Sequence, residues 1–170
     1  HSGSGSISIK TTGAIFIQPK NNSFTFLKAV ESGALTLDDD WDFGTTASSF
    51  TFGKITNTKD FTMLKSLTVN GAISIFGGVL SLSGTYTSTN TGDIWIKSNA
   101  TNVGSTPSIY FQTDVLKTGG NRSKLLMQAM GRINYANPKK IKATNTALDV
   151  ILWSDFDNSN NDGGTTVYCD

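Results

Sequence analysis

The sequence has very little cysteine, histidine, glutamate and proline. Cys169, His1 and Glu31 are each the only residue of their type, and three prolines occur in 170 residues. A single cysteine excludes a disulfide framework within the chain and a zinc site built from cysteines. A single histidine at the first position argues against a Ser-His-Asp triad and against histidine-bound zinc. Hydrolysis by a Ser-His-Asp triad or by histidine-bound zinc is therefore not expected.

Long apolar runs and an excess of charge are also missing. No apolar stretch approaches the roughly 20 residues that a membrane-spanning helix needs, and 14 Lys and Arg face 13 Asp and Glu, giving a net charge of +1. We therefore expect neither membrane insertion nor nucleic-acid binding. Residues 1–6 lack the basic end and apolar stretch of a secretion signal. We interpret these six residues as a cloning scar or as an internal point at which a longer chain was cut.

The abundant residues are threonine, serine, glycine and asparagine, which make up 73 of 170 positions. Threonine, together with Ile, Val and Phe, suits a pleated surface, whereas Gly, Asn and Ser supply turns. Charged residues are only 16% of the chain, so the Glu- and Lys-rich composition typical of helices is absent. An all-β fold is the prediction.

Short alternating segments, many led by glycine, recur along the whole chain. Their common form is G-x-I-x-I, and it begins at Gly5, Gly13, Gly33, Gly71, Gly78, Gly92 and Gly131. Similar positions recur at an interval of about 20 residues, a period typical of a solenoid. The pairs that show this interval are Ile15 with Leu35, Ile73 with Ile94, and Ile133 with Ile151.

The repeat predicts a right-handed parallel β-helix of about eight stacked coils, each roughly 20 residues long. Glycine at a strand entrance suits a corner that needs a positive φ angle. Residues 1–170 are interpreted as one β-helix segment, taken from a longer repetitive chain. Residues 123–130 are read as a strand from their place in the repeat. The alternative is a β-sandwich or jelly roll with antiparallel hairpins, which Asn70-Gly71 would favour.

Two tryptophans are placed by alternation within the expected strands. Trp95 lies between Ile94 and Ile96, so it should point outward if the isoleucines face the core. An outward tryptophan is a candidate for stacking on sugar rings, and the alternative is packing by neighbouring long side chains. Trp153 is interpreted as a core residue that faces the same way as Ile151.

Two acidic segments are candidate binding sites. Asp38, Asp40 and Asp42 surround Trp41 and could hold a sugar or a cation. The alternative is a solvated turn with Trp41 covering an edge of the core. Later in the chain, oxygen-bearing side chains suit calcium, although the EF-hand spacing is not met. These residues are Asp155, Asp157, Asn161 and Asp162.

Three longer segments resemble a known family. Residues 68–82 are similar to "GxIxIxGGxLxL" coils and residues 92–97 to "GDIxIx" coils, while residues 142–157 with Gly163-Gly164 resemble an "NTxLxVxLWSDxD…GG" closing segment. Such coils occur in β-helical segments of large secreted bacterial adhesins, of the filamentous-haemagglutinin and two-partner-secretion kind. The likeness spans about residues 65–164.

The resemblance implies a secreted, non-enzymatic stalk or adhesive segment at a bacterial cell surface. Its partners would be glycans, cell-surface proteins and neighbouring repeats of the same chain, and no cofactor is expected apart from calcium. Two other functions stay open at this point. One is a polysaccharide lyase or hydrolase built on a β-helix, and the other is a carbohydrate-binding β-sandwich.

Overall fold

The computed structural model describes residues 7–18, 35–37, 41–100, 107–136, 138–157 and 165–167, and every regular element in these ranges is a β-strand. The described chain therefore contains no helix, and so none long and apolar enough to cross a membrane. The all-β prediction is confirmed.

Sixteen of the strands form three parallel sheets. The broad sheet contains β2 (Ala14–Ile17), β5 (Ser49–Phe52), β8 (Ala72–Gly77), β11 (Ile94–Ser98), β14 (Ser123–Ala129) and β17 (Leu148–Ser154). The second sheet contains β3 (Leu35–Leu37), β6 (Phe61–Met63), β9 (Leu80–Leu82), β12 (Ile109–Phe111), β15 (Ile133–Tyr135) and β18 (Thr165–Val167). The third sheet contains β7 (Leu67–Val69), β10 (Tyr86–Ser88), β13 (Val115–Lys117) and β16 (Ile141–Ala143). The two remaining strands, β1 (Ile7–Ser8) and β4 (Trp41–Asp42), pair with each other.

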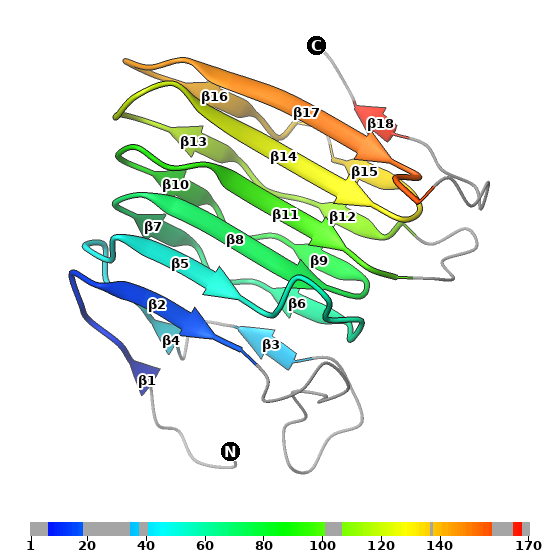
Figure 1. Ribbon diagram of the computed structural model, residues 1–170, viewed down its shortest axis with the longest axis horizontal. Helices are drawn as coiled ribbons and strands as arrows, with labels where there is room; N and C mark the ends of the chain where they lie inside the picture. Colours follow the sequence, from blue (N-terminus) through cyan, green and yellow to red (C-terminus); the bar gives the residue numbers. More distant parts are fainter. Residues whose placement is uncertain are drawn as a thin grey trace.

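Consecutive strands lie in different sheets, and each strand pairs in parallel with the strand three places further along the chain, except that no pairing joins β4 to β7. Three consecutive strands therefore make one layer, and the layers stack as Figure 1 shows. Every described pairing is parallel. Asn70-Gly71 joins β7 to β8, which belong to different sheets, so it is not a hairpin turn. The arrangement is compatible with a solenoid.

The predicted repeat length is only partly correct. Ile73 and Ile94 do stack on each other, as the repeat predicts, but the spacing between stacked partners varies along the chain. It is shortest, and equal, from β6 to β9 and from β7 to β10, and it is much longer from β2 to β5. The described chain forms six layers rather than about eight. Ile15 and Leu35 lie in two sheets of one layer, and Ile151 pairs with Leu126 rather than with Ile133.

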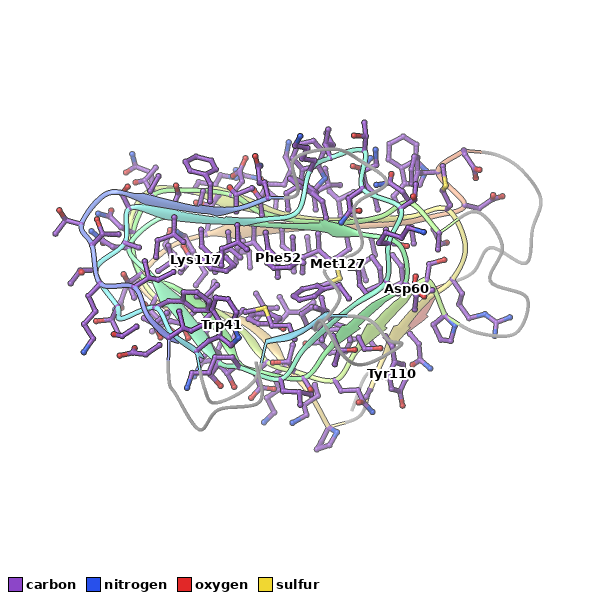
Figure 2. The ribbon with its side chains drawn as sticks, turned by 90° about the horizontal axis from the view of Figure 1, so that it is seen from below. Trp41, Phe52, Asp60, Tyr110, Lys117 and Met127 are labelled. Carbon is purple, nitrogen blue, oxygen red and sulfur yellow. The ribbon has the colours of Figure 1, made fainter. Side chains whose placement is uncertain are left out.

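The core lies between the broad sheet and the other two. Inward side chains form rows through the layers, and the first row is fully buried at Phe50, Ile73, Ile94 and Leu125, each 0% exposed. Phe52 stacks on Phe61 across the interior with ring centroids 3.9 Å apart. Figure 2 shows Phe52 and Met127 pointing into this interior. Each such side chain contributes roughly 1.5–3 kcal/mol by leaving water. Residues 123–129 form a strand, as predicted.

The glycines at strand entrances are required mainly for close approach between layers. A Cβ atom at Gly71 would lie 2.0 Å from the carbonyl oxygen of Ser48, and one at Gly78 would lie 2.4 Å from that of Thr58. Gly92 has a φ of +152°, but Gly71 and Gly78 are not in the positive range. The predicted positive φ is thus wrong for most of the described positions.

One lysine lies inside the core. Lys117 ends β13 with its side chain buried, and Figure 2 places it at one end of the interior. Its ammonium donates to Ser88 Oγ, 3.0 Å away, and to the carbonyl oxygen of Asn90. Burial lowers the pKa of Lys117, and the nearby charge of Asp93 opposes that shift. The polar contacts explain how an ammonium is accommodated here.

Candidate functional site

The outer surface of the broad sheet carries a group of aromatic side chains between β8 and β17. Ile94 and Ile96 face the core, so Trp95 points outward, as predicted, in one row with Leu126 and Ile151. A neighbouring row runs through Phe76, Lys97, Gln128 and Trp153. With Phe156, which contacts this second row, we call the whole set the aromatic face: Phe76, Trp95, Lys97, Leu126, Gln128, Ile151, Trp153 and Phe156.

Contacts on both sides fix the indole ring of Trp95. Its Nε1–H donates to Gln128 Oε1 at 2.9 Å, and its ring meets Phe76 edge-on at a centroid distance of 5.2 Å. Aromatic rings prefer this edge-to-face arrangement. Trp95 is half-buried, and Phe76 is almost covered. The predicted alternative, packing by neighbouring long side chains, therefore describes Trp95 well, although part of the indole stays exposed.

Trp153 is the most exposed tryptophan among the described residues, at 50%. Its ring meets Phe156 edge-on at 6.2 Å, and the Lys97 ammonium lies 5.0 Å from the centroid of the Phe156 ring. Phe156 reaches this position because the chain turns at Asp155, whose φ is +53°. After that turn the Phe156 N–H donates to the carbonyl oxygen of Ala129. These contacts hold two aromatic rings and a cation together at one end of the aromatic face.

The prediction that Trp153 belongs to the core is wrong. Val150 pairs with Leu125 and Leu152 pairs with Met127, both inward residues, so these two residues of β17 face the interior. Alternation then places Ile151 and Trp153 on the outside. Val150, Ile151, Leu152 and Trp153 form an unbroken apolar run, which satisfies either orientation. Only the pairing of β17 with β14 decides whether Trp153 points inward or outward.

The aromatic face has the chemistry of a surface for flat, hydroxyl-bearing ligands. Trp and Tyr side chains combine a large apolar ring with a polar group, and exposed rings pack against apolar faces of a ligand. Gln128 and Lys97 supply an amide and an ammonium that can bond hydroxyl groups. Trp95 and Trp153 lie two strands apart, about 10 Å along the stacking direction. The two rings could thus contact one extended ligand.

The acidic segment near Trp41 is only partly described. Trp41 packs against the core, with its ring stacked on Phe43 at 5.8 Å, which matches the alternative of a residue covering a core edge. Asp42 accepts the Gly44 N–H at 2.9 Å and pairs with the Lys10 ammonium at 3.2 Å. These two contacts, the Gly44 bond first, lower the pKa of Asp42. Asp38 and Asp40 lie outside the described residues.

Only two of the four predicted calcium ligands lie in the described part of the chain. Asp155 and Asp157 are described, and Asp157 is exposed. Asn161 and Asp162 lie outside the described residues. Within the described part of the chain, no three His, Cys, Asp or Glu side chains are grouped so as to hold a metal ion. Calcium binding stays a prediction.

Several aspartates that sequence reasoning did not single out bridge the layers. Each directly precedes a strand and accepts a backbone N–H from the layer above, so it extends the sheet ladder at a corner. The bonds run to Asp60 from Val79 at 2.8 Å, to Asp93 from Lys124 at 2.8 Å and to Asp114 from Lys140 at 2.9 Å. An aspartate immediately before an apolar, alternating segment is the sequence signal that could have found them.

Asp149, the one carboxylate of β17, is paired with a cationic side chain. Asp149 receives two bonds from Arg122, of 2.9 Å from Nε and 2.6 Å from Nη2. The Arg122 bond lowers the pKa of Asp149, and the carboxylate in turn raises the pKa of Arg122.

No family model, curated protein or solved structure matches this chain. Its function is therefore argued from these residues.

Proposed function

We propose that this chain is a non-enzymatic, adhesive segment of a secreted bacterial cell-surface protein, and that it binds a glycan on the aromatic face. The observation that carries the proposal is the exposure of Trp153 beside Trp95, Phe156 and Gln128 on one sheet surface. The likeness of residues 65–164 to coils of filamentous-haemagglutinin-type adhesins supports the cellular setting.

The fold that we propose is a right-handed parallel β-helix. Parallel strands in stacked sheets, with each strand paired to the one three places on, support it. Connections between parallel strands are right-handed in nearly all known cases. Layers that pair on both faces give a stiff rod, which suits a segment that must present a binding surface away from a cell.

An extended glycan suits the aromatic face better than the other ligand classes. The broad sheet runs nearly straight in Figure 2, so its outer surface can lie along several sugar units. Net charge is +1, and Arg122 on this side is already paired with Asp149, so a polyanion such as nucleic acid is not favoured. Exposed aromatic rings with adjacent amide and ammonium groups offer stacking and hydrogen bonds together.

The partners of five of the seven described aspartates support a binding role rather than catalysis. Asp60, Asp93 and Asp114 accept backbone N–H groups, while Asp42 and Asp149 form ion pairs. A glycosidase or lyase would need carboxylates that are available to a substrate. Release of reducing or unsaturated ends from any bound polymer would contradict the non-enzymatic proposal.

A glycan array probed with the whole chain tests the binding proposal. We expect saturable binding, at least tenfold weaker in Trp153→Ala and weaker in Trp95→Ala. Phe16→Ala is the matched control, because Phe16 is 64% exposed on the outer side of β2, several strands from the aromatic face. No binding to any glycan by the folded protein, or equal loss in all three variants, would overturn the proposal.

A second arm of the same experiment tests calcium. Binding that disappears with a chelator and returns with calcium would support a cation site in the segment from Asp155 to Asp162. Equal binding under both conditions would contradict that site and leave the aromatic face as the binding surface.

A further inference from the structure

Three hydrogen-bond donors form one row across the aromatic face. Lys97 in β11 pairs in register with Gln128 in β14, and Gln128 pairs with Trp153 in β17. Neighbouring strands lie about 4.8 Å apart, so an ammonium, an amide and an indole N–H follow one another on successive strands. Lysine and tryptophan side chains are donors without an acceptor atom. The row therefore presents donors to a ligand along the stacking direction.

The one acceptor atom among these three side chains is already used. Gln128 Oε1 accepts the Trp95 indole N–H at 2.9 Å. That bond orients the Gln128 amide and leaves its Nε2 hydrogens as the group that a ligand meets. A ligand that satisfies the row must therefore bring acceptors.

Lys97 is the only charged side chain of the aromatic face, and it is half-buried. Its ammonium lies 5.0 Å from the centroid of the Phe156 ring, and among the described residues no carboxylate lies within ion-pair distance of it. The attraction between a cation and a ring is modest at a partly exposed site. A partly buried charge is more stable when an opposite charge bonds to it. The position beside Lys97 therefore favours an anionic group of the ligand.

The aspartates of β17 and of the turn that follows it do not compete for this ammonium. Asp149 receives two bonds from Arg122. Asp155 has an interaction of its own, and Asp157 is exposed, so that water and salt screen its charge. Among the described residues, a ligand carboxylate thus has no protein carboxylate to displace from Lys97.

The other members of the aromatic face limit the ligand to isolated charges. Four of them have no polar side-chain atom, and a charge buried against such groups loses water without gaining a partner. These four are Phe76, Leu126, Ile151 and Phe156. A polymer with a sulfate or phosphate on every unit would place most of its charges against them. One ammonium instead fits a glycan in which an acidic sugar has neutral neighbours.

We propose that the glycan bound on the aromatic face contains a uronic acid whose carboxylate lies over Lys97 and Gln128, an inference that rests on the proposed glycan-binding function. A carboxylate has two acceptor oxygens, so one accepts from the Lys97 ammonium and the other from Gln128 Nε2 on the next strand. An adjacent neutral sugar then reaches Trp153, one strand further along the row, and stacks on its exposed ring.

An array of paired oligosaccharides tests the inference with the whole chain. Each uronic-acid oligosaccharide is printed beside the same molecule after its carboxylates have been reduced to primary alcohols, and neutral glycans are included. The bound members should be carboxylate forms, and reduction should weaken binding at least about tenfold, the size expected for a hydrogen bond to a charged group. Binding that is no weaker after reduction, or that is confined to neutral glycans, would overturn the uronic acid and leave glycan binding intact. No binding to any glycan would overturn the proposed function as well.

Variants of the row locate the carboxylate. Lys97→Met keeps an unbranched side chain beside Phe156 but removes the charge, so the ratio of carboxylate to alcohol binding should fall to about one. Gln128→Glu keeps an oxygen for the Trp95 indole and replaces the Nε2 donor with a negative charge. In that variant the alcohol forms should bind better than the carboxylate forms.

Lys124→Met is the matched control. Lys124 is exposed on the outer side of β14, the strand that also contains Gln128, and its backbone N–H bonds Asp93 without the ammonium. This variant should retain the preference for carboxylate forms. An equal loss in Lys124→Met and Lys97→Met would attribute the preference to the general charge of the sheet, and a preference that survives in Lys97→Met would place the carboxylate elsewhere. Either result would overturn the inference.

Discussion

The middle layers and the C-terminal layer share one strand pattern but differ in what lies beside them. Leu125 in β14 has strands on both sides and is completely buried, whereas Val150, its partner in β17, has one neighbouring strand among the described residues and is 46% exposed. Both are aliphatic residues facing the same interior. Alternation thus determines which way a side chain points, but the neighbouring layers determine how much of it leaves water.

The difference indicates how stability is distributed along the stack. In a stacked architecture each layer contacts only its neighbours, so stability is roughly a sum of layers and of interfaces between them. Among the described strands, a middle layer has two such interfaces and the layer of β17 has one. Substitutions at equivalent positions should therefore have unequal effects, and four experiments can test this difference.

The largest expected effect comes from shortening two side chains of the same inward row, one in a middle layer and its partner in β17. Leu125→Ala should lower the free energy of unfolding by about 4 kcal/mol, because it leaves a cavity between two layers. Val150→Ala should cost less than about 1 kcal/mol in dilute solution, because its side chain is already partly hydrated. Urea unfolding monitored by circular dichroism measures both. Equal costs would show that the last layer is as well packed as the middle.

A second experiment tests the glycines that precede strands of the broad sheet. Gly71→Ala should destabilise the protein by about 3 kcal/mol, because the new methyl group would overlap the Ser48 carbonyl of the layer below. Gly13→Ala is the matched control in the first layer. There the nearest atom is Thr11 Oγ1, 3.4 Å away, so we expect a change below about 0.5 kcal/mol. A similar loss in both would point to strand propensity instead of crowding.

The third experiment removes the buried charge of a middle layer. Lys117→Met should raise the free energy of unfolding by about 1 kcal/mol at pH 7, because the ammonium no longer has to leave water. Ser88 Oγ keeps its bond to the Gly71 carbonyl in this variant, so it does not become unpaired. A large destabilisation would show that the lysine bonds outweigh the cost of burying the charge.

The pH dependence gives this experiment an internal check. Burial lowers the pKa of Lys117 in the folded protein below its unfolded value near 10.4. Between these two pKa values the unfolded chain binds more protons than the folded chain, so wild-type stability rises with pH. The advantage of the methionine variant should therefore shrink as pH rises towards about 10. An advantage that is constant with pH would mean that Lys117 does not lose its proton in the folded protein.

The smallest effect concerns the exposed ion pairs of the two end regions. Arg122→Gln should slightly lower the urea midpoint at pH 7, and the difference from wild type should vanish as pH falls below about 4. The sign follows from the lowered pKa of Asp149, whose contribution is present above the unfolded pKa and is lost as the carboxylate is protonated. Lys10→Gln, which breaks a single contact to Asp42, should have a smaller effect. A difference that persists in acid would contradict the electrostatic origin.

Predictions from sequence succeeded where small or polar residues flank each large apolar position. Ile73 and Ile75 alternate with Ala72 and Ser74, so the inward face was evident. The repeat length was predicted less well, because connections of different lengths join similar strands and closing a longer loop costs little extra free energy. Ile15 and Leu35 look like equivalent positions one period apart, yet they belong to different sheets.

The aromatic face was predicted only through Trp95. Trp153 was placed in the core because the apolar run from Val150 to Trp153 has no polar residue to mark the outer side. Phe156 and Gln128 could not be associated with Trp95, since both lie far from it along the chain. The pairing of β11 with β14 and of β14 with β17 brings them together.

The sequence by itself determined that this protein is built from short β-strands, and in most of them it determined which side chains face inward, because alternation of side chains along a strand is a local property of the backbone. Only the tertiary structure decided which strands stack, how much chain separates them, and which apolar residues stay exposed. Those features depend on contacts between distant segments, and a residue such as Val150 is buried only if another layer lies against it.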